Sequence, residues 1–382
     1  MAYIQSLDNG RFRAWIETGS GYNRERRSQY FDTKKEAEDW VSRMVIDRND
    51  GLITNPDKIS FQNFATRWLD NHKKPNIAAS TYRNYKQQLD SYLIPFFKDI
   101  MMKDINLYQI EDYFNSMRKS GSLRHNGGLS ETTLNKHYIT LNQICKHAAK
   151  PGIRLLKYNP VSAIEPPKQK TKEAEVMTAN EYTRLLKASK DNTHIFTFVL
   201  TALYTGMRRS EILGLEWEDV DLAAGVINVR KRYVNTVEGY QHELATKTDS
   251  SKRQISISEK LISVLKEYKK THLEYRLHFG PDYYDETDFV FCKPDGSPYH
   301  PDYYNKQFNQ LLSETGLSSK YKIHTLRHTF ATINLRNKVD SKVVQEMLGH
   351  ASESTTKDIY QHVDLEMQKD AISKMDDAIN FD

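Results

Sequence analysis

The chain has 382 residues and a mass of 44.6 kDa, a length that favours two or three domains over one. It has no run of about 18 apolar residues, and its first residues, MAYIQSLDNG, lack the apolar stretch of a signal peptide. We therefore expect neither a membrane span nor secretion. The two cysteines, Cys145 and Cys292, are far apart and outside any metal-ligand spacing, which argues against a disulfide framework or a structural zinc site and favours a cytoplasmic protein.

The net charge of +5 is unevenly distributed along the chain. Residues 1–57 carry 9 Lys and Arg against 10 Asp and Glu, residues 58–172 carry 19 against 8, and residues 173–382 carry 27 against 32. A basic segment between near-neutral and acidic segments is typical of a module that binds a polyanion, because each neutralised phosphate releases counterions. The alternative is a solvated helical surface rich in lysine.

The first segment, residues 1–57, predicts a three-stranded β-sheet plus a helix. Asp8-Asn9-Gly10 is a hairpin signal between strands at 3–7 and 11–17, and 27–31 supplies a third strand. A helix opened by a capping box at 33–36 covers the apolar face of this sheet. The opposite face, with Arg11, Arg13 and Trp15, is left open.

The second segment, residues 58–165, predicts an all-α four-helix bundle. Its apolar stripes at helical spacing lie within residues 61–69, 82–93, 107–117 and 134–148. We expect the aromatic residues of these stripes in the core, because helical spacing places them on the inner face. Basic side chains of the first two helices are then available on the exposed faces. They are Lys73, Lys74, Arg83 and Lys86.

The third segment predicts an α+β, mainly helical domain at 178–382, joined through a stiff and charged linker at 166–177. Helices are expected at 179–188 and 193–204, strands at 226–235 and 253–258, and helices from there to the C-terminus.

Six polar residues of this segment are candidates for chemistry. They are Arg208 after a glycine between helices, Lys247 in a turn between strands, His324 and Arg327 at i and i+3 on one helix, His350 after a glycine C-cap, and Tyr360 on a short polar helix. Each has an ordinary alternative, such as a partner for Glu211 in the case of Arg208. His324 and His328, at i and i+4, are also candidate metal ligands. The sequence supports this interpretation weakly, because the glutamate of HExxH and a third ligand are missing.

Together the six residues resemble the catalytic signature of the tyrosine recombinase family, the lambda-type phage integrases. The motifs TGMRRSEIL, TKT, HTLRH, LGH and TxxxYxH stand in the family's order between residues 178 and 363. The resemblance implies that 178–382 is the catalytic domain. The first two segments resemble the arm-binding and core-binding domains of longer integrases, as in phages and conjugative transposons.

What the resemblance implies is a site-specific recombinase that integrates or excises a mobile element through a covalent 3′-phosphotyrosyl intermediate on Tyr360. Two arginines suit the non-bridging phosphate oxygens through their planar forks. His324 is the candidate base for a phenol whose ordinary pKa is about 10, and Lys247 the acid for the leaving 5′ oxygen. His350 would donate a hydrogen bond to the phosphate. The resemblance also implies rejoining without a nucleotide cofactor or a metal, which fits a sequence with no GxxxxGK[ST] loop and no obvious carboxylate cluster for two metals.

The expected partners are double-stranded DNA with core and arm attachment sites, three further copies of the chain on that DNA, an excisionase and a host DNA-bending protein. We expect Arg11, Arg13 and Trp15 to enter a DNA groove, as β-ribbon readers do, or else to form a solvated outer face. The tail carries an apolar stripe that would dock on a neighbouring or on its own catalytic domain. The stripe consists of Leu365, Ile372, Met375 and Ile379.

Two alternatives use the same residues differently. A type IB topoisomerase-like or hairpin-resolving strand transferase would share the chemistry without recombining two sites. A non-catalytic DNA-binding regulator would keep the tyrosine and histidines as structural residues, but it has no need to place all six groups in register.

Overall fold

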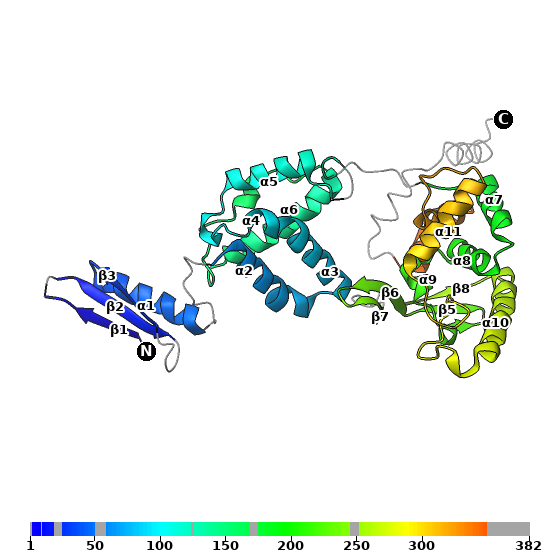
Figure 1. Cartoon of the computed structure of the whole chain (residues 1–382), viewed down its shortest axis with the longest axis horizontal. Coiled ribbons are helices and arrows are strands. Elements are labelled where there is room, and N and C mark those ends of the chain that lie inside the picture. Colours follow the sequence, from blue (N-terminus) through cyan, green and yellow to red (C-terminus); the bar gives the residue numbers. More distant parts are fainter. Residues whose placement is uncertain are drawn as a thin grey trace, which may run out of the picture. The chain divides into compact units, whose positions relative to one another are not determined.

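A computed structural model of the chain describes residues 2–8, 10–18, 25–49, 59–123, 126–168, 175–244 and 252–349. The chain divides into two compact units, Met1–Thr171 and Lys172–Asp382. Figure 1 shows the helices and strands of each unit, and most of these elements are helices. The expected arrangement of small sheets within a mainly helical chain is therefore present.

The first unit begins with an antiparallel sheet in the order β1-β2-β3. Its strands are β1 (Ala2–Ser6), β2 (Phe12–Thr18) and β3 (Glu25–Phe31), followed by helix α1 (Lys34–Asn49). Ala14 and Ile16 of β2 and Ala37 of α1 are fully buried, and α1 packs along the strands. The predicted sheet with one covered face is confirmed, and the capping box is made by Thr33 and Glu36.

The rest of the first unit is helical, as the four apolar stripes predict. Its helices are α2 (Phe61–Arg67), α3 (Ala79–Gln88), α4 (Ile94–Phe97), α5 (Leu107–Ser120) and α6 (Glu131–Ala148). Two π-helical segments, η3 (Trp68–Lys73) and η5 (Leu89–Leu93), continue α2 and α3, and 3-10 turns lie at Lys74–Asn76, Met102–Asp104 and Pro160–Ala163. The π-helical segments were not predicted, because such a turn shifts the apolar stripe without ending it.

Aromatic rings form much of the core of this helical part. The ring centroids of Phe61 and Phe97 are 5.1 Å apart, and those of Phe97 and Tyr113 are 5.3 Å apart. Trp68 is also buried. The buried hydroxyl of Tyr113 lies 2.8 Å from Nδ1 of His137, so its polar end is satisfied. The expectation that the aromatic stripes belong to the core is confirmed for Phe61 and Trp68, whereas Phe97 and Tyr113 were not among the predicted stripe residues.

The second unit contains seven described helices and five strands. The helices are α7 (Ala179–Ser189), α8 (Thr193–Thr205), α9 (Arg209–Leu213), α10 (Glu259–Phe279), α11 (Pro301–Glu314), α12 (Ile323–Arg336) and α13 (Ser341–Leu348). The strands are β4 (Val220–Asp221), β5 (Val226–Val229), β6 (Lys231–Thr236), β7 (Gly239–Leu244) and β8 (Arg253–Ser256). Short 3-10 turns lie at Trp217–Asp219 and Gly280–Asp282.

The single strand predicted at 226–235 is wrong, because two sheets share this stretch. β5 lies between β4 and β8, whereas β6 pairs with β7 in a separate hairpin. Three consecutive basic residues, Arg230 to Arg232, break the alternation, and Nζ of Lys231 lies 2.6 Å from Oε1 of Glu216. The strand β7 was not predicted, because GYQHEL has no alternating apolar residues.

Helix α8 forms the centre of the second unit. It is buried on most of its circumference and contacts α7, α10 and α12. It ends at Gly206, whose φ of +61° is the left-handed conformation that favours glycine. A Cβ atom here would lie 2.4 Å from Cδ1 of Phe330 and 2.8 Å from Cδ2 of Leu348. The glycine therefore lets α12 and α13 approach the end of α8 closely.

No helix among the described residues is long and apolar enough to cross a membrane.

Candidate active site

Arg208 stands between helices α8 and α9, where the chain reverses after Gly206. It is the N-cap residue of α9, with an extended backbone at φ −69° and ψ 148°. Its backbone N–H donates to Oε2 of Glu211 at 2.8 Å, and its Nη1 donates to Oε1 of the same carboxylate at 2.7 Å. The predicted alternative, that Arg208 pairs with Glu211, is thus confirmed as a contact. The side chain of Arg208 is nevertheless 38% exposed.

The carboxylate of Glu211 is buried and has a second cationic partner, Arg253 of strand β8. Nη2 of Arg253 donates to Oε2 at 2.8 Å and Nη1 donates to Oε1 at 3.2 Å. The side chains of Arg253 and Glu211 are only 6% and 5% exposed. Burial alone would raise the pKa of Glu211, but hydrogen bonds and charge from Arg253 and Arg208 lower it to about 2. The carboxylate is therefore ionised throughout the physiological range.

Arg327 lies in the interior on helix α12 and is 2% exposed. Its Nη1 donates to the carbonyl oxygen of Gly206 and its Nη2 to that of Leu348, both at 2.7 Å. Burial, with a smaller contribution from Arg208, lowers the pKa of Arg327 to about 9. The side chain is still protonated at neutral pH, and a bound anion would stabilise its charge.

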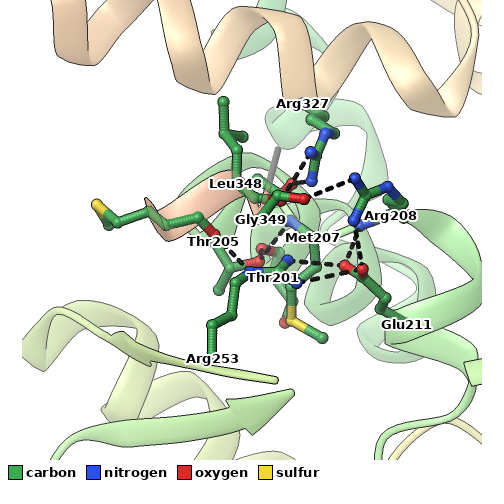
Figure 2. A network of polar contacts seen from close by, with 11 residues as sticks. Thr201, Thr205, Met207, Arg208, Glu211, Arg253, Arg327, Leu348 and Gly349 are labelled. Atoms are coloured by element: carbon green, nitrogen blue, oxygen red, sulfur yellow. Dashed lines mark hydrogen bonds and ion pairs between the residues drawn. The ribbon is translucent and has the colours of Figure 1, made fainter. Parts of the chain in front are cut away.

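Three arginines meet at the C-terminal end of helix α13 (Figure 2). Nε of Arg253 donates to the carbonyl oxygen of Met347 at 2.6 Å, Nη2 of Arg327 to that of Leu348, and Nη2 of Arg208 to that of Gly349 at 3.0 Å. These carbonyls have no partner within the helix, and they carry the negative end of its dipole. The arginines therefore satisfy three consecutive acceptors and bring α9, β8, α12 and α13 together.

The predicted glycine C-cap at Gly349 is confirmed, with φ of +65°. A Cβ atom there would lie 3.0 Å from Nη1 of Arg253. The C-cap thus leaves room for the arginine beneath it.

His324 lies at the protein surface, three residues before Arg327 on α12. It borders a cleft of about 570 Å³ that also contains Arg208. The complete lining consists of Arg208, Arg209, Ser210, Asn305, Phe308, Asn309, Lys322, Ile323 and His324. Partial desolvation of the ring lowers the pKa of His324 to about 4, with smaller contributions from His328 and the two arginines. The imidazole is therefore neutral near pH 7 and able to accept a proton.

The structure brings together three of the six predicted catalytic residues, Arg208, His324 and Arg327, around the ends of α8, α12 and α13. The other three lie outside the described residues. Lys247 falls between β7 and β8, and His350 and Tyr360 follow Gly349 in the chain. The apolar tail stripe from residue 365 to 379 also lies outside them.

A metal site at His324 and His328 has no support from the described residues. The two rings are perpendicular with centroids 4.7 Å apart. Within the described ranges, no group of three or more His, Cys, Asp or Glu side chains is placed to hold a metal ion.

Sequence reasoning missed Arg253. The sequence nevertheless indicates that Arg253 is buried. Alternation in β8 places it on the same side as Ile255, which is fully buried. An arginine on the buried side of a strand needs a carboxylate or carbonyl partner.

The open face of the first sheet carries the predicted basic and aromatic residues. Trp15 stacks on Tyr3 with centroids 5.5 Å apart, and the guanidinium of Arg13 lies 5.5 Å from the centroid of the Tyr30 ring. Arg26, which the sequence reasoning missed, lies 4.6 Å from the Trp15 ring. Arg11 differs from Arg13, because its Nε bonds to Oδ1 of Asp32 at 2.7 Å.

The basic residues of the helical part lie beside aromatic rings or carboxylates. Nζ of Lys73 is 5.4 Å from the Trp68 ring, and Nζ of Lys74 is 5.3 Å from the Tyr82 ring. Lys86 pairs with Asp90 at 3.1 Å. Arg83 is half-buried on α3.

Parts of both units match protein-family models of phage integrases. Residues 175–367 match the model of the phage integrase family, and residues 60–118 match that of the SAM-like N-terminal domain of phage integrases. The ICEBs1 integrase of Bacillus subtilis is 24% identical, over 98% of this chain and all of its own length.

Two solved structures share the fold. The Tn1549 transposon integrase in complex with circular intermediate DNA superposes with a TM-score of 0.67 and 18% identity, over 82% of this chain and 99% of its own. A lambda integrase tetramer bound to a Holliday junction gives a TM-score of 0.56 and 16% identity, over 94% of each chain.

The arginine and histidine cluster and the matched families define the class of enzymes that cleave and rejoin DNA strands by means of a tyrosine. The chain belongs to the phage integrase family of tyrosine recombinases. Its activity is site-specific DNA recombination, and the topoisomerase-like and regulatory alternatives are not favoured.

Replacing Glu211 by Gln tests the buried ion pairs. We expect the free energy of unfolding at pH 7 to fall by about 3–5 kcal/mol, because Arg253 is left buried without a counter-ion. Glu218→Gln, at a carboxylate whose side chain is 62% exposed, should cost less than about 1 kcal/mol. Urea unfolding of both variants measures the difference.

The stability difference between the wild type and Glu211→Gln should depend on pH. The pKa of Glu211 is lower in the folded chain than its ordinary 4.5, so the carboxylate stabilises the fold above pH 4.5 and this contribution is lost as the pH falls toward 2. The difference between the wild type and Glu211→Gln should therefore shrink below pH 4.5. A difference that is constant from pH 7 to pH 3 would contradict the assignment.

Proposed function

We propose that the cluster around Arg208, His324 and Arg327 binds the scissile phosphate of a recombination site and that Tyr360 attacks it. The observation that carries this proposal is the convergence of two arginine forks and a neutral histidine at the junction of α8, α12 and α13. Phosphoryl transfer needs little from a protein beyond positioning and cationic stabilisation of the phosphate oxygens. Such a convergence supplies both.

Each of the six groups has one role in the proposed reaction. Arg208 and Arg327 hydrogen-bond the non-bridging oxygens. The phenol oxygen of Tyr360 forms a bond to phosphorus while the bond from phosphorus to the 5′ oxygen breaks, and the phenol proton passes to His324. Lys247 gives a proton to the departing 5′ oxygen, and His350 donates a hydrogen bond to the phosphate.

Rejoining reverses these steps. A 5′ hydroxyl from another strand attacks the 3′-phosphotyrosyl bond, Lys247 takes up the proton of that hydroxyl, and His324 returns a proton to the phenol oxygen as it leaves. Because the covalent link conserves the energy of the broken phosphodiester, this scheme requires no nucleotide cofactor.

We further propose three functional regions. Residues 1–57 would bind arm sites through the open face of the first sheet, 58–165 would bind the core site, and 178–382 would carry out catalysis after the linker at 166–177. The family match over residues 60–118 supports the second assignment. The paired basic and aromatic side chains around Trp15 support the first.

The active assembly would be four copies of the chain on two duplexes. The likeness in fold to the lambda integrase tetramer on a Holliday junction supports this proposal. Double-stranded DNA is the substrate, and an excisionase and a host DNA-bending protein are proposed partners.

Tyr360→Phe tests the nucleophile. On a nicked suicide duplex that carries the joined ends of the element, the wild type should form a covalent protein–DNA adduct, because the cleaved strand cannot be rejoined. The variant should form none, since phenylalanine has no oxygen to bond to phosphorus. Denaturing electrophoresis and peptide mapping provide the measurement.

The matched control is Tyr275→Phe, at a tyrosine exposed on α10, which should form adduct at the wild-type rate. If Tyr360→Phe still formed the adduct, the nucleophile assignment would be wrong.

The double variant Arg13→Ala, Arg26→Ala tests the open sheet face. We expect weaker binding to arm-site DNA, and a plot of log affinity against log salt whose slope is shallower by about 0.9 for each lost phosphate contact. Cleavage of a core-site duplex should be unchanged, because these residues lie outside the catalytic region.

Lys34→Ala is the matched control, since Lys34 is an exposed cation on α1 that pairs with Glu38. Equal loss of arm binding and core cleavage in the double variant would refute separate arm and core functions.

A further inference from the structure

Arg253 has every nitrogen of its guanidinium bonded within the protein. Nε bonds to the carbonyl oxygen of Met347, and Nη1 and Nη2 bond to the two oxygens of Glu211. The side chain is 6% exposed and is absent from the lining of the cleft that contains Arg208 and His324. Arg253 therefore engages each nitrogen of its guanidinium with an acceptor of the protein, which favours a role within the protein over direct contact with DNA.

Arg208 differs from Arg253 although both bond to Glu211. It shares the carboxylate through Nη1, reaches the carbonyl oxygen of Gly349 through Nη2, and lines the cleft. The two arginines hold the carboxylate from two sides, as Figure 2 shows. One of them faces the substrate side and the other faces the interior.

The charges of this trio decide how much positive field Arg208 offers. One carboxylate between two guanidinium groups leaves a net charge of +1. If Arg253 were neutral, the charge of Glu211 would be balanced by Arg208 alone, and the trio would present no net charge to a phosphate. The interaction energy of buried charges is large because the surroundings have a low effective dielectric constant.

Loss of Arg253 would also change the hydrogen bonding of Arg208. Without Arg253, both oxygens of Glu211 would be open to a bidentate pair with Arg208, the arrangement that a guanidinium and a carboxylate prefer. Forming that pair would draw the fork away from Gly349 and from the cleft.

We propose that Arg253 is a positioning residue that neutralises Glu211, and thereby leaves the charge and the fork of Arg208 to the scissile phosphate. This inference rests on the proposed function, because it assigns to Arg253 a role in the step that Arg208 performs. Arg253 acts through Glu211 and touches no reacting atom.

The test compares Arg253→Met with the double variant Arg253→Met, Glu211→Gln. Single-turnover adduct formation on the suicide duplex should fall roughly 100-fold in Arg253→Met, the loss typical of a displaced reacting group, whereas DNA affinity should change less than about threefold, since other contacts dominate it. The double variant should recover at least about tenfold over the single variant, because removing both charges restores a net charge of +1.

Arg230→Met is the matched control. Arg230 pairs with the buried carboxylate of Asp219, so this variant also removes one cationic partner of a buried carboxylate, but it does so away from Arg208. We expect it to lower the melting temperature by an amount similar to Arg253→Met while leaving the cleavage rate within about threefold of the wild type.

A folded double variant that cleaves no faster than Arg253→Met would overturn the proposal, because a purely structural role predicts that the two losses add. Arg253→Lys covers the case in which Arg253→Met fails to fold. It keeps the positive charge beside Glu211 but loses the bidentate fork, so it should cleave within about tenfold of the wild type, and a folded Arg253→Lys with a loss of roughly 100-fold would count against neutralisation.

Different results would refute the proposed function itself. If the wild-type chain formed no adduct, or if Tyr360→Phe formed one, the catalytic assignment would fail before any variant of Arg253 was compared.

Discussion

The second unit depends on a buried carboxylate and on three helix-terminal carbonyls that need cations in the interior. Glu211 is buried, and the carbonyl oxygens of residues 347, 348 and 349 have no donor within helix α13. Arg208, Arg253 and Arg327 supply the donors. Because these arginines come from the start of α9, from β8 and from α12, the same contacts that satisfy these acceptors also fix the geometry of the site.

This arrangement explains why two arginines can be held ready without substrate. A guanidinium group with five donors can bond to protein acceptors on one side and still offer donors on another. Arg208 uses Nη1 and Nη2 to hold Glu211 and Gly349, and 38% of its side chain stays exposed. A site organised before substrate binds needs little reorganisation during the reaction, which is the main source of electrostatic catalysis.

Sequence reasoning predicted the parts of this site that depend on local patterns. Arg208 follows a helix-ending glycine, and His324 and Arg327 are separated by one helical turn, so spacing and motif order were sufficient to find them. Arg253 was missed because its role depends on a carboxylate 42 residues earlier in the chain, and tertiary pairs of this kind leave no periodic signal. The β6-β7 hairpin was missed in part for a related reason, since ion pairs and not apolar alternation set its boundaries. The roles of Lys247, His350 and Tyr360 stay predictions from the motif.

The central claim is that Arg208 and Arg327 bind one phosphate while Arg253 keeps Glu211 neutralised. A crystal structure of Tyr360→Phe on an uncleaved core-site duplex tests it most directly. We predict that the non-bridging oxygens of the scissile phosphate lie within hydrogen-bond distance of both Arg208 and Arg327, with Glu211 still bonded to Arg253. A phosphate distant from either arginine, or a Glu211 that has left Arg253 to pair with Arg208 alone, would contradict the account.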